Sequence, residues 1–189
     1  GKPMTPLAQK RLLAAIEALD QDRLDDAIAR LDRISARGLG PFGQGLAFQM
    51  RAGIATNRGD VEGAARYMQQ SVDAGGFCGE RLEAARIQLA QLEMALEHWD
   101  AAIARLEGVI ADSETPSAEV WYRIGLAQYR AGRLEPAFDA ARKAIELGGS
   151  EPKEPWQLLL LQIHWDRKEL DACVPILRAL AIAHPKRDY

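Results

Sequence analysis

The residues of this sequence best suited to chemistry are one glycine-rich segment, three histidines and two cysteines. The segment from Gly38 to Gly43 reads Gly-Leu-Gly-Pro-Phe-Gly and has the G-x-G-x-x-G spacing of dinucleotide-binding loops. Such a loop works between a β-strand and the N-terminus of a helix, where backbone N–H groups receive a pyrophosphate. Here the segment follows a helical pattern, contains Pro41 and has no strand pattern beside it. We therefore interpret it as a connection between helices.

The histidines and cysteines are too scattered to predict a metal or catalytic centre. His98, His164 and His184 lie in three separate parts of the chain, and none has a second His, Cys or carboxylate at a ligand-like offset on the same helix face, apart from generic helix charges. Zinc needs three or four convergent ligands, and a nucleophile needs a base and an orienting group beside it. We expect Cys173 to be a buried packing thiol and Cys78 to lie in an exposed loop. The sequence thus predicts no enzyme activity, no cofactor and no metal.

The composition favours a helical protein that binds neither nucleic acid nor membrane. The chain has 189 residues, with 24 Lys and Arg against 27 Asp and Glu, so its formal net charge is −3. This balance argues against nucleic acid and anionic membrane as partners. No apolar run is longer than five residues, whereas a membrane span needs roughly 20. Alanine fills 32 positions, which favours helix.

A repeat runs through the chain. Inside each amphipathic stretch a small residue, which we call the anchor, is followed four positions later by a residue that is usually larger and apolar, as in Ala64 and Met68. The anchors are Ala27, Ala64, Ala102, Ala137 and Cys173. Their spacings of 37, 38, 35 and 36 residues are nearly constant, which indicates a helical repeat array.

These signals predict ten helices, paired as helical hairpins. The expected spans are 7–20, 24–37, 44–57, 61–74, 81–96, 100–111, 118–131, 135–147, 155–167 and 171–183. No segment alternates apolar and polar residues as a strand would. The sequence therefore predicts an all-α fold, a right-handed α-solenoid of about five hairpins. The expected repeats of this single domain, 1–189, are at about 7–41, 44–78, 81–116, 118–151 and 154–187.

The segment from Ala118 to Phe138 resembles a tetratricopeptide repeat, whose pattern is W-x-x-L-G-x-x-Y followed by a small residue on the second helix. The residues that fill the slots of this pattern are Trp121, Ile124, Gly125 and Ala137, with Gln128 where tyrosine is usual. The resemblance implies a solenoid whose first helices line a concave groove. It also implies a non-catalytic scaffold that binds a protein or peptide in that groove.

The register set at Trp121 predicts which side chains line the groove. The expected groove residues are Ile87, Gln91, Met94, Glu119, Tyr122, Leu126, Tyr129, Arg130, Leu158, Gln162, Trp165 and Asp166. This mixture of aromatic, apolar and charged side chains suits a docked peptide. The alternative, that a given residue packs against its own second helix, stays open.

Some members of the family hold a peptide C-terminus with a clamp of Lys and Asn. The matching positions in this chain are occupied by Gln49, Gly53, Ile87, Gln91, Tyr122 and Leu126. The clamp residues are therefore absent, and we do not expect the chain to bind a C-terminal carboxylate in that way.

A narrower resemblance concerns the C-terminal part of the chain. The run from Glu151 to Leu160 and the ending from His184 to Tyr189 are similar to bacterial tetratricopeptide proteins encoded beside TonB-dependent energy-transduction systems. This implies a periplasmic protein that continues beyond Tyr189 and works in an envelope complex, with a cytoplasmic scaffold as the alternative. The last helix, 171–183, is apolar over a wide arc, so a homodimer through it, or self-assembly, is a second hypothesis.

Overall fold

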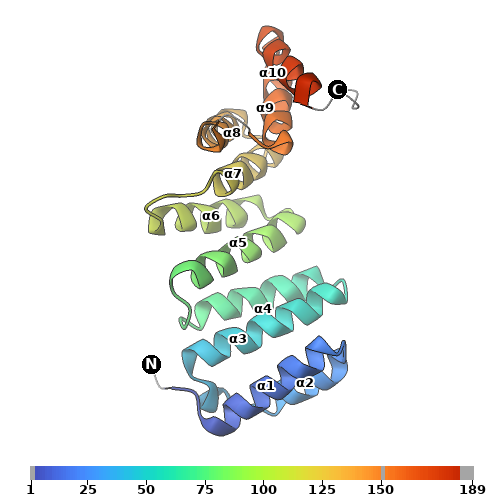
Figure 1. Cartoon of the computed structure of the whole chain (residues 1–189), viewed down its shortest axis with the longest axis vertical. Helices are drawn as coiled ribbons and strands as arrows, with labels where there is room; N and C mark the ends of the chain where they lie inside the picture. Colours follow the sequence, from blue (N-terminus) through green and yellow to red (C-terminus); the bar gives the residue numbers. More distant parts are fainter. Residues whose placement is uncertain (1–2, 150–151, 184–189) are drawn as a thin grey trace. The chain divides into compact units, whose positions relative to one another are not determined.

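The computed structural model describes residues 3–149 and 152–183 (Figure 1). Within these residues the chain forms ten α-helices and no strand. The helices are α1 (Pro6–Asp20), α2 (Leu24–Asp32), α3 (Ala36–Asn57), α4 (Val61–Asp73), α5 (Gly79–Ala95), α6 (Trp99–Asp112), α7 (Ala118–Arg130), α8 (Leu134–Gly148), α9 (Glu154–Asp166) and α10 (Leu170–Ala183). The predicted all-α helical repeat fold is confirmed.

The helix bounds match the predicted spans to within a few residues, except between α2 and α3. The helix predicted over 24–37 ends at Asp32, and α3 begins at Ala36, ahead of the predicted start at residue 44. Gly40 interrupts α3 with φ 62° and ψ 172°, a backbone conformation that favours glycine, and Pro41 follows it. The glycine-rich segment is therefore a break inside a helix, which agrees with its interpretation as a connection.

The helices fall into two compact units. The N-terminal unit, up to Leu96, holds α1 to α5, and the C-terminal unit, from Glu97, holds α6 to α10. In the N-terminal unit α1 packs on α2 and α3, α3 on α4, and α4 on α5. In the C-terminal unit α6 packs on α7, α7 on α8 and α9, and α9 on α8 and α10. Paired helices such as α3 and α4 run antiparallel (Figure 1).

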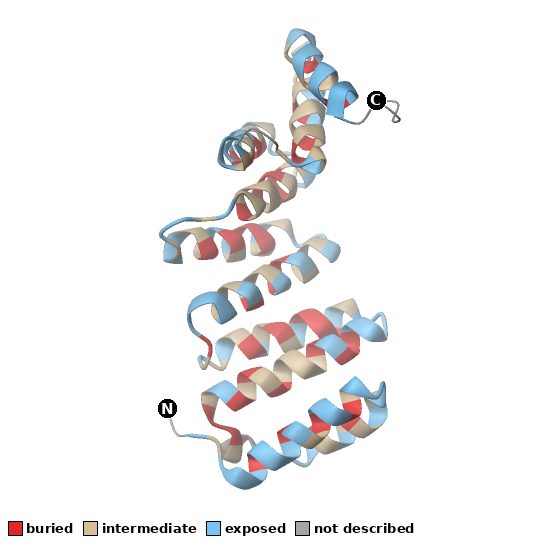
Figure 2. Ribbon diagram, in the orientation of Figure 1, coloured by how far each residue is buried: buried red, intermediate tan, exposed pale blue. Residues whose placement is uncertain are grey.

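The anchors lie where paired helices approach each other. Ala27, Ala64, Ala102 and Ala137 have no exposed surface, and Cys173 is also buried. The residues four positions later are buried in the first four repeats, namely Leu31, Met68, Leu106 and Ala141. In the fifth repeat that residue, Leu177, is only half-buried. Figure 2 shows the buried residues on the helix sides that face neighbouring helices.

A left-handed residue precedes every anchor by five positions. These residues are Asp22, Gly59, Glu97, Gly132 and Lys168, with φ between 56° and 76°. The turn that starts the second helix therefore has the same backbone conformation in all five repeats. Three of the five residues are not glycine, although this conformation is strained for residues that have a Cβ atom.

Lys168→Gly is expected to stabilise the protein by about 0.5–1 kcal/mol. Glycine removes the left-handed strain, which costs roughly 1 kcal/mol or more, although it also makes the unfolded chain more flexible. Urea unfolding followed by circular dichroism measures the change. The matched control is Gly132→Ala at the same turn position, which should lose about 1 kcal/mol. Equal stability of all three proteins would contradict the turn geometry.

Ion pairs connect neighbouring hairpins within each unit. A carboxylate in the first turn of a second helix meets an arginine at the next hairpin turn of the same unit. The pairs are Arg58–Asp25, Arg133–Asp100 and Arg167–Glu135. Each pair has an exposed carboxylate and contributes less than about 1 kcal/mol. In α4 the carboxylate caps the helix, because Asp60 Oδ1 accepts a hydrogen bond from the Gly63 N–H at 2.8 Å.

Candidate functional site

The N-terminal unit contains a cleft of about 540 Å³. Its walls come mainly from α3 and α5, the first helices of the second and third repeats, with one residue each from α1, α2 and α4. The lining residues are Leu19, Leu24, Gln49, Met50, Ala52, Gly53, Ile54, Thr56, Asn57, Met68, Gln88, Gln91 and Leu92. A cleft on first helices is where the sequence predicts a groove.

The lining of this cleft carries no charged residue, although 27% of the whole chain is charged. Its polar groups are amides and one hydroxyl, and Gln49 Nε2 donates a hydrogen bond to Gln88 Oε1 at 3.3 Å. Met50 and Leu92 add flexible apolar surface. Amides can hydrogen-bond a peptide backbone. An ionised group of a ligand, in contrast, would lose its hydration in the cleft and would find no opposite charge there.

Gly53 keeps this cleft open. A Cβ atom at Gly53 would meet no atom within 4 Å, so a larger side chain would extend into free space. Glycine inside a helix costs roughly 0.5–1 kcal/mol relative to alanine, so helix formation alone does not explain its presence in α3. The effect of Gly53 is to leave room between the amide groups of α3 and α5.

In the C-terminal unit α7 and α9 bring several predicted groove residues together. Tyr122, Leu126 and Tyr129 pack against a core cluster from α8 and α9. Tyr129 Oη donates a hydrogen bond to Asp166 Oδ2 at 2.7 Å, and Gln162 Nε2 donates to Asp166 Oδ1 at 3.2 Å. The register prediction placed Tyr129, Gln162 and Asp166 on one face, and the structure joins them by hydrogen bonds.

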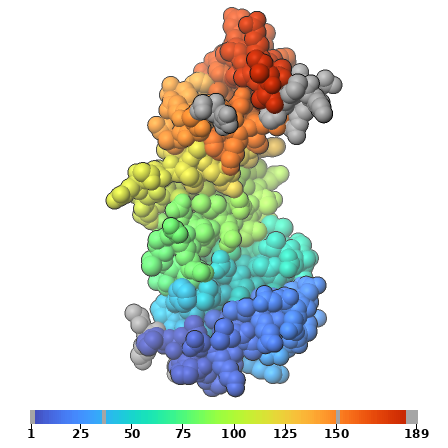
Figure 3. Space-filling view, in the orientation of Figure 1, coloured from blue at the N-terminus to red at the C-terminus, as the bar shows by residue number. Residues whose placement is uncertain are grey.

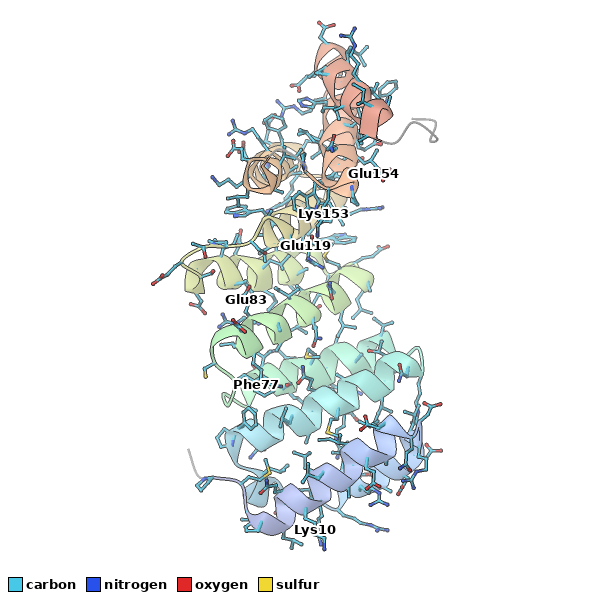
Figure 4. The ribbon with its side chains drawn as sticks, viewed as in Figure 1. Lys10, Phe77, Glu83, Glu119, Lys153 and Glu154 are labelled. Carbon is cyan, nitrogen blue, oxygen red and sulfur yellow. The ribbon has the colours of Figure 1, made fainter. Side chains whose placement is uncertain are left out.

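Charged residues lie beside this aromatic face (Figure 4). Glu119 accepts hydrogen bonds from Arg123 Nη1 at 2.6 Å and from Lys153 Nζ at 3.0 Å. Lys153 Nζ also lies 5.2 Å from the Trp156 ring centroid, which is 6.3 Å from that of Tyr122. The Tyr122 ring therefore lies near a buried tryptophan, and Lys153 connects that tryptophan to the ion pair with Glu119. The two units therefore differ in chemistry: one cleft is neutral, and the other face is aromatic with charges at its edge.

Tyr122 and Tyr129 are expected to ionise at higher pH than free tyrosine. Burial is the largest cause of both raised pKa values; the Glu119 charge adds to it for Tyr122, and the Asp166 hydrogen bond for Tyr129. Because folding favours the neutral phenols, their contribution to stability is complete below the unfolded-state pKa of 10.0 and is lost as pH rises through the folded-state pKa. Ultraviolet titration of the phenolates measures the pKa values. Transitions no higher than in the urea-unfolded chain would contradict the expectation.

The remaining predicted groove residues are spread over three helices and differ in how far they are exposed. On α5, Gln91 lines the cleft, whereas Ile87 and Met94 are half-buried and are not among the lining residues. On α7 and α9, Leu158 is half-buried, Arg130 is exposed, and Trp165 is 61% exposed. The placement of Trp165 leaves a large aromatic surface in contact with solvent. The binding role of all these residues stays a prediction.

Sequence reasoning missed the contribution of α3 to the cleft. Gln49 and Gly53 were considered only as positions where clamp residues are absent, yet they line the cleft together with Gln91. The available signal was the spacing of Gln49 and Gly53, which are four residues apart and therefore lie on one side of a helix.

The residues that the structure describes include no group of three or more His, Cys, Asp and Glu able to hold a metal ion. His164 Nδ1 lies 2.7 Å from Glu169 Oε2, and its ring meets that of Phe138 edge-on at 5.3 Å. Cys173 is buried and Cys78 exposed, as predicted. His184 lies outside the described residues. None of the described helices combines the length and apolar character needed to cross a membrane.

A sequence model of the tetratricopeptide repeat family matches residues 12–77 and 87–152, more than two-thirds of the chain. The chain belongs to the tetratricopeptide repeat family. This confirms the broader resemblance drawn from the segment around Trp121, and it assigns a family whose members bind other proteins through stacked helical hairpins. The narrower resemblance to TonB-associated proteins has no support from the comparisons with known proteins.

Solved structures with the same fold include MamA from Desulfovibrio magneticus RS-1, residues 41 to the end. It is 17% identical, has a TM-score of 0.77, and the match covers 98% of this chain and 99% of that one. A kinesin light chain-like array of nearly identical TPR-like repeats from Podosopora anserina is 16% identical, with a TM-score of 0.67 and coverage of 95% and 96%. Likeness at these identities concerns the fold alone. Among curated proteins, none matches the sequence significantly.

Proposed function

We propose that this tetratricopeptide repeat protein is a non-catalytic scaffold that binds a protein or peptide through the first helices of its repeats. The observation that carries the proposal is the neutral cleft of the N-terminal unit, built mainly from the first helices α3 and α5. Its size, about 540 Å³, suits a short polypeptide segment, and its amides match the hydrogen-bonding needs of a peptide backbone.

The aromatic face of the C-terminal unit supports the same proposal. Tyrosine and tryptophan dominate binding energies at protein interfaces because they bury large surfaces at low entropic cost. Trp165 is 61% exposed, and Tyr129 is held in position by its hydrogen bond to Asp166. An exposed indole and a phenol held in position on the same unit suit a partner that supplies an apolar side chain.

Affinity capture with matched variants tests this proposal. The parent chain is compared with Tyr122→Ala/Tyr129→Ala/Trp165→Ala, which removes the aromatic face, and with Gly53→Trp, which fills the cleft. If one variant captures a protein with an affinity at least about tenfold weaker than the parent, a difference of about 1.4 kcal/mol, the binding site lies in the unit that carries the substitution. Gly53→Ala is the control, because it adds one methyl group and leaves the cleft open.

Equal capture by all four proteins would contradict the proposal and move the binding surface away from the first helices. Circular dichroism of each variant keeps a loss of folding separate from a loss of binding. A protein that the parent captures, but that neither the triple aromatic variant nor Gly53→Trp captures, would be a partner that contacts both units.

We further propose that the partner belongs to a TonB-type envelope complex and that the protein is periplasmic. The support is the sequence resemblance of the run from Glu151 to Leu160 and of the ending at Tyr189. Osmotic-shock fractionation of the native host tests the location: release with periplasmic proteins supports it. Retention in the cytosol would favour the alternative of a cytosolic regulatory scaffold. A self-assembly module is the second alternative, because the last helix has an open apolar face.

A further inference from the structure

Helix α10 carries apolar side chains on two faces. On one face Cys173 and Leu180 are buried, and Cys173 Sγ lies 4.0 Å from the Leu161 carbonyl oxygen of α9. On the other face Leu170 is 56% exposed and Val174 is 45% exposed. One face therefore packs against α9, while the second is open within the part of the chain that the structure describes. Figure 3 shows α10, in red, with a large open surface.

The open face has the spacing of a coiled-coil seam. Leu170, Val174, Leu177 and Ala181 are separated by four, three and four positions, so they form one row along the helix. Leu177 is half-buried and Ala181 is exposed. We call this row the α10 seam. A helix presents such a row to a second helix that packs alongside it.

Two charged residues flank the α10 seam on one side. Asp171 follows Leu170 and Arg178 follows Leu177, so the two charges lie two turns apart beside the seam. Both are exposed, and neither forms an ion pair with another side chain that the structure describes. Because the signs are opposite, this edge of the helix is complementary to itself when the second helix runs in the reverse direction.

We propose that α10 docks antiparallel against α10 of a second copy of this chain. A two-fold axis makes the contact self-complementary. In this register Leu170 meets the partner's Ala181, and Val174 meets the partner's Leu177. The same register places Asp171 beside the partner's Arg178, twice per dimer. In a parallel pair the position facing Arg178 would be the partner's Cys173, which is uncharged, so the charges favour the antiparallel arrangement.

The proposed dimer specifies the residues and the helix orientation through which the chain would self-assemble, and it does not use the first helices of the repeats. A single helix pair buries less than the roughly 800 Å² per partner of a standard interface, so the dimer is weak and depends on concentration. We expect association in the micromolar range or weaker.

Sedimentation equilibrium over a range of concentrations tests the dimer. Val174→Ser, inside the α10 seam, is expected to weaken association by about tenfold or more, since it removes two buried methyl-rich contacts per dimer. Ile182→Ser is the matched control: Ile182 is 83% exposed, lies outside the seam, and should leave association unchanged.

Charge reversal tests the orientation. Asp171→Arg and Arg178→Asp each place like charges opposite one another twice per dimer, and each should weaken association by several-fold. The double variant Asp171→Arg/Arg178→Asp restores opposite signs and should return to within about threefold of the parent. Circular dichroism of the four proteins checks that α10 remains helical.

Several results would overturn the proposal. A parent chain that stays monomeric at every concentration removes the dimer, and a double variant that fails to recover removes the antiparallel pairing. Equal effects of Val174→Ser and Ile182→Ser would place the contact outside the seam. If a chain extended past Tyr189 no longer associates, the extension rather than a second copy covers the α10 seam. None of these results bears on binding at the first helices, which the capture experiment tests separately.

Discussion

Gly76→Ala should destabilise the protein by about 3 kcal/mol or more. The connection between α4 and α5 passes so close to the break in α3 that a Cβ atom at Gly76 would lie 2.2 Å from the Phe42 nitrogen and 2.3 Å from the Pro41 carbonyl carbon. Both are backbone atoms, which cannot move aside as the end of a flexible side chain can. The added methyl group must therefore separate two segments of the N-terminal unit. Urea unfolding followed by circular dichroism measures the loss.

Gly53→Ala is the matched control for this prediction. It adds the same methyl group in the same unit, but no atom lies within 4 Å of the new Cβ position. Because alanine is the better helix former, a gain of up to about 1 kcal/mol is expected. If Gly76→Ala unfolded within about 1 kcal/mol of the parent, the close approach of the two backbones would not exist in solution.

Ile163→Ala should cost about 2–5 kcal/mol, because it leaves a cavity in the core of the C-terminal unit. Ile163 has no exposed surface and packs in a cluster with Ala137, Ala141 and Leu159. The small alanines on α8 cannot expand to fill the space that Ile163 leaves. Thermal unfolding monitored by circular dichroism should show a large drop in the midpoint for this variant.

Trp165→Ala provides the comparison two residues further along α9. Although it removes a larger side chain, Trp165 is 61% exposed, so the expected change in stability is within about 0.5 kcal/mol. The two variants thus separate packing from binding: Ile163→Ala should change stability, and Trp165→Ala should change capture of a partner. A large stability loss in Trp165→Ala would show that the indole is part of the core and would remove it from the candidate surface.

The repeat itself could be predicted from the sequence because its signals are local. Two helices can cross closely only where a small residue lies between them, and the anchors are these small residues. The turn that precedes each anchor has the same length in every repeat. The structure buries all five anchors and gives the five turns the same left-handed residue. The exception was the stretch after α2: the sequence predicted one helix up to residue 37, whereas α2 ends at Asp32 and α3 begins at Ala36 and is broken at Gly40.

The candidate site could be predicted only in part because it depends on contacts between repeats. The register at Trp121 selected Tyr129 on α7 and Gln162 on α9 as groove residues, and the structure shows both side chains bonded to Asp166, although their role in binding stays a prediction. On α5 the same reasoning selected Ile87 and Met94, which do not line the cleft. A rotation of one helix by a fraction of a turn changes which side chains line a cleft, and it leaves the hydrophobic pattern almost unchanged.

The amino-acid sequence by itself determined the fold class, the repeat family and the position of the turn inside each hairpin, because these depend on residues within one or two helical turns of each other. Only the tertiary structure decided that Gly53 opens a neutral cleft and that Gly76 must pass beside a backbone. Those properties arise where helices from different repeats meet, and the distances between them are set by packing of side chains that are remote in sequence.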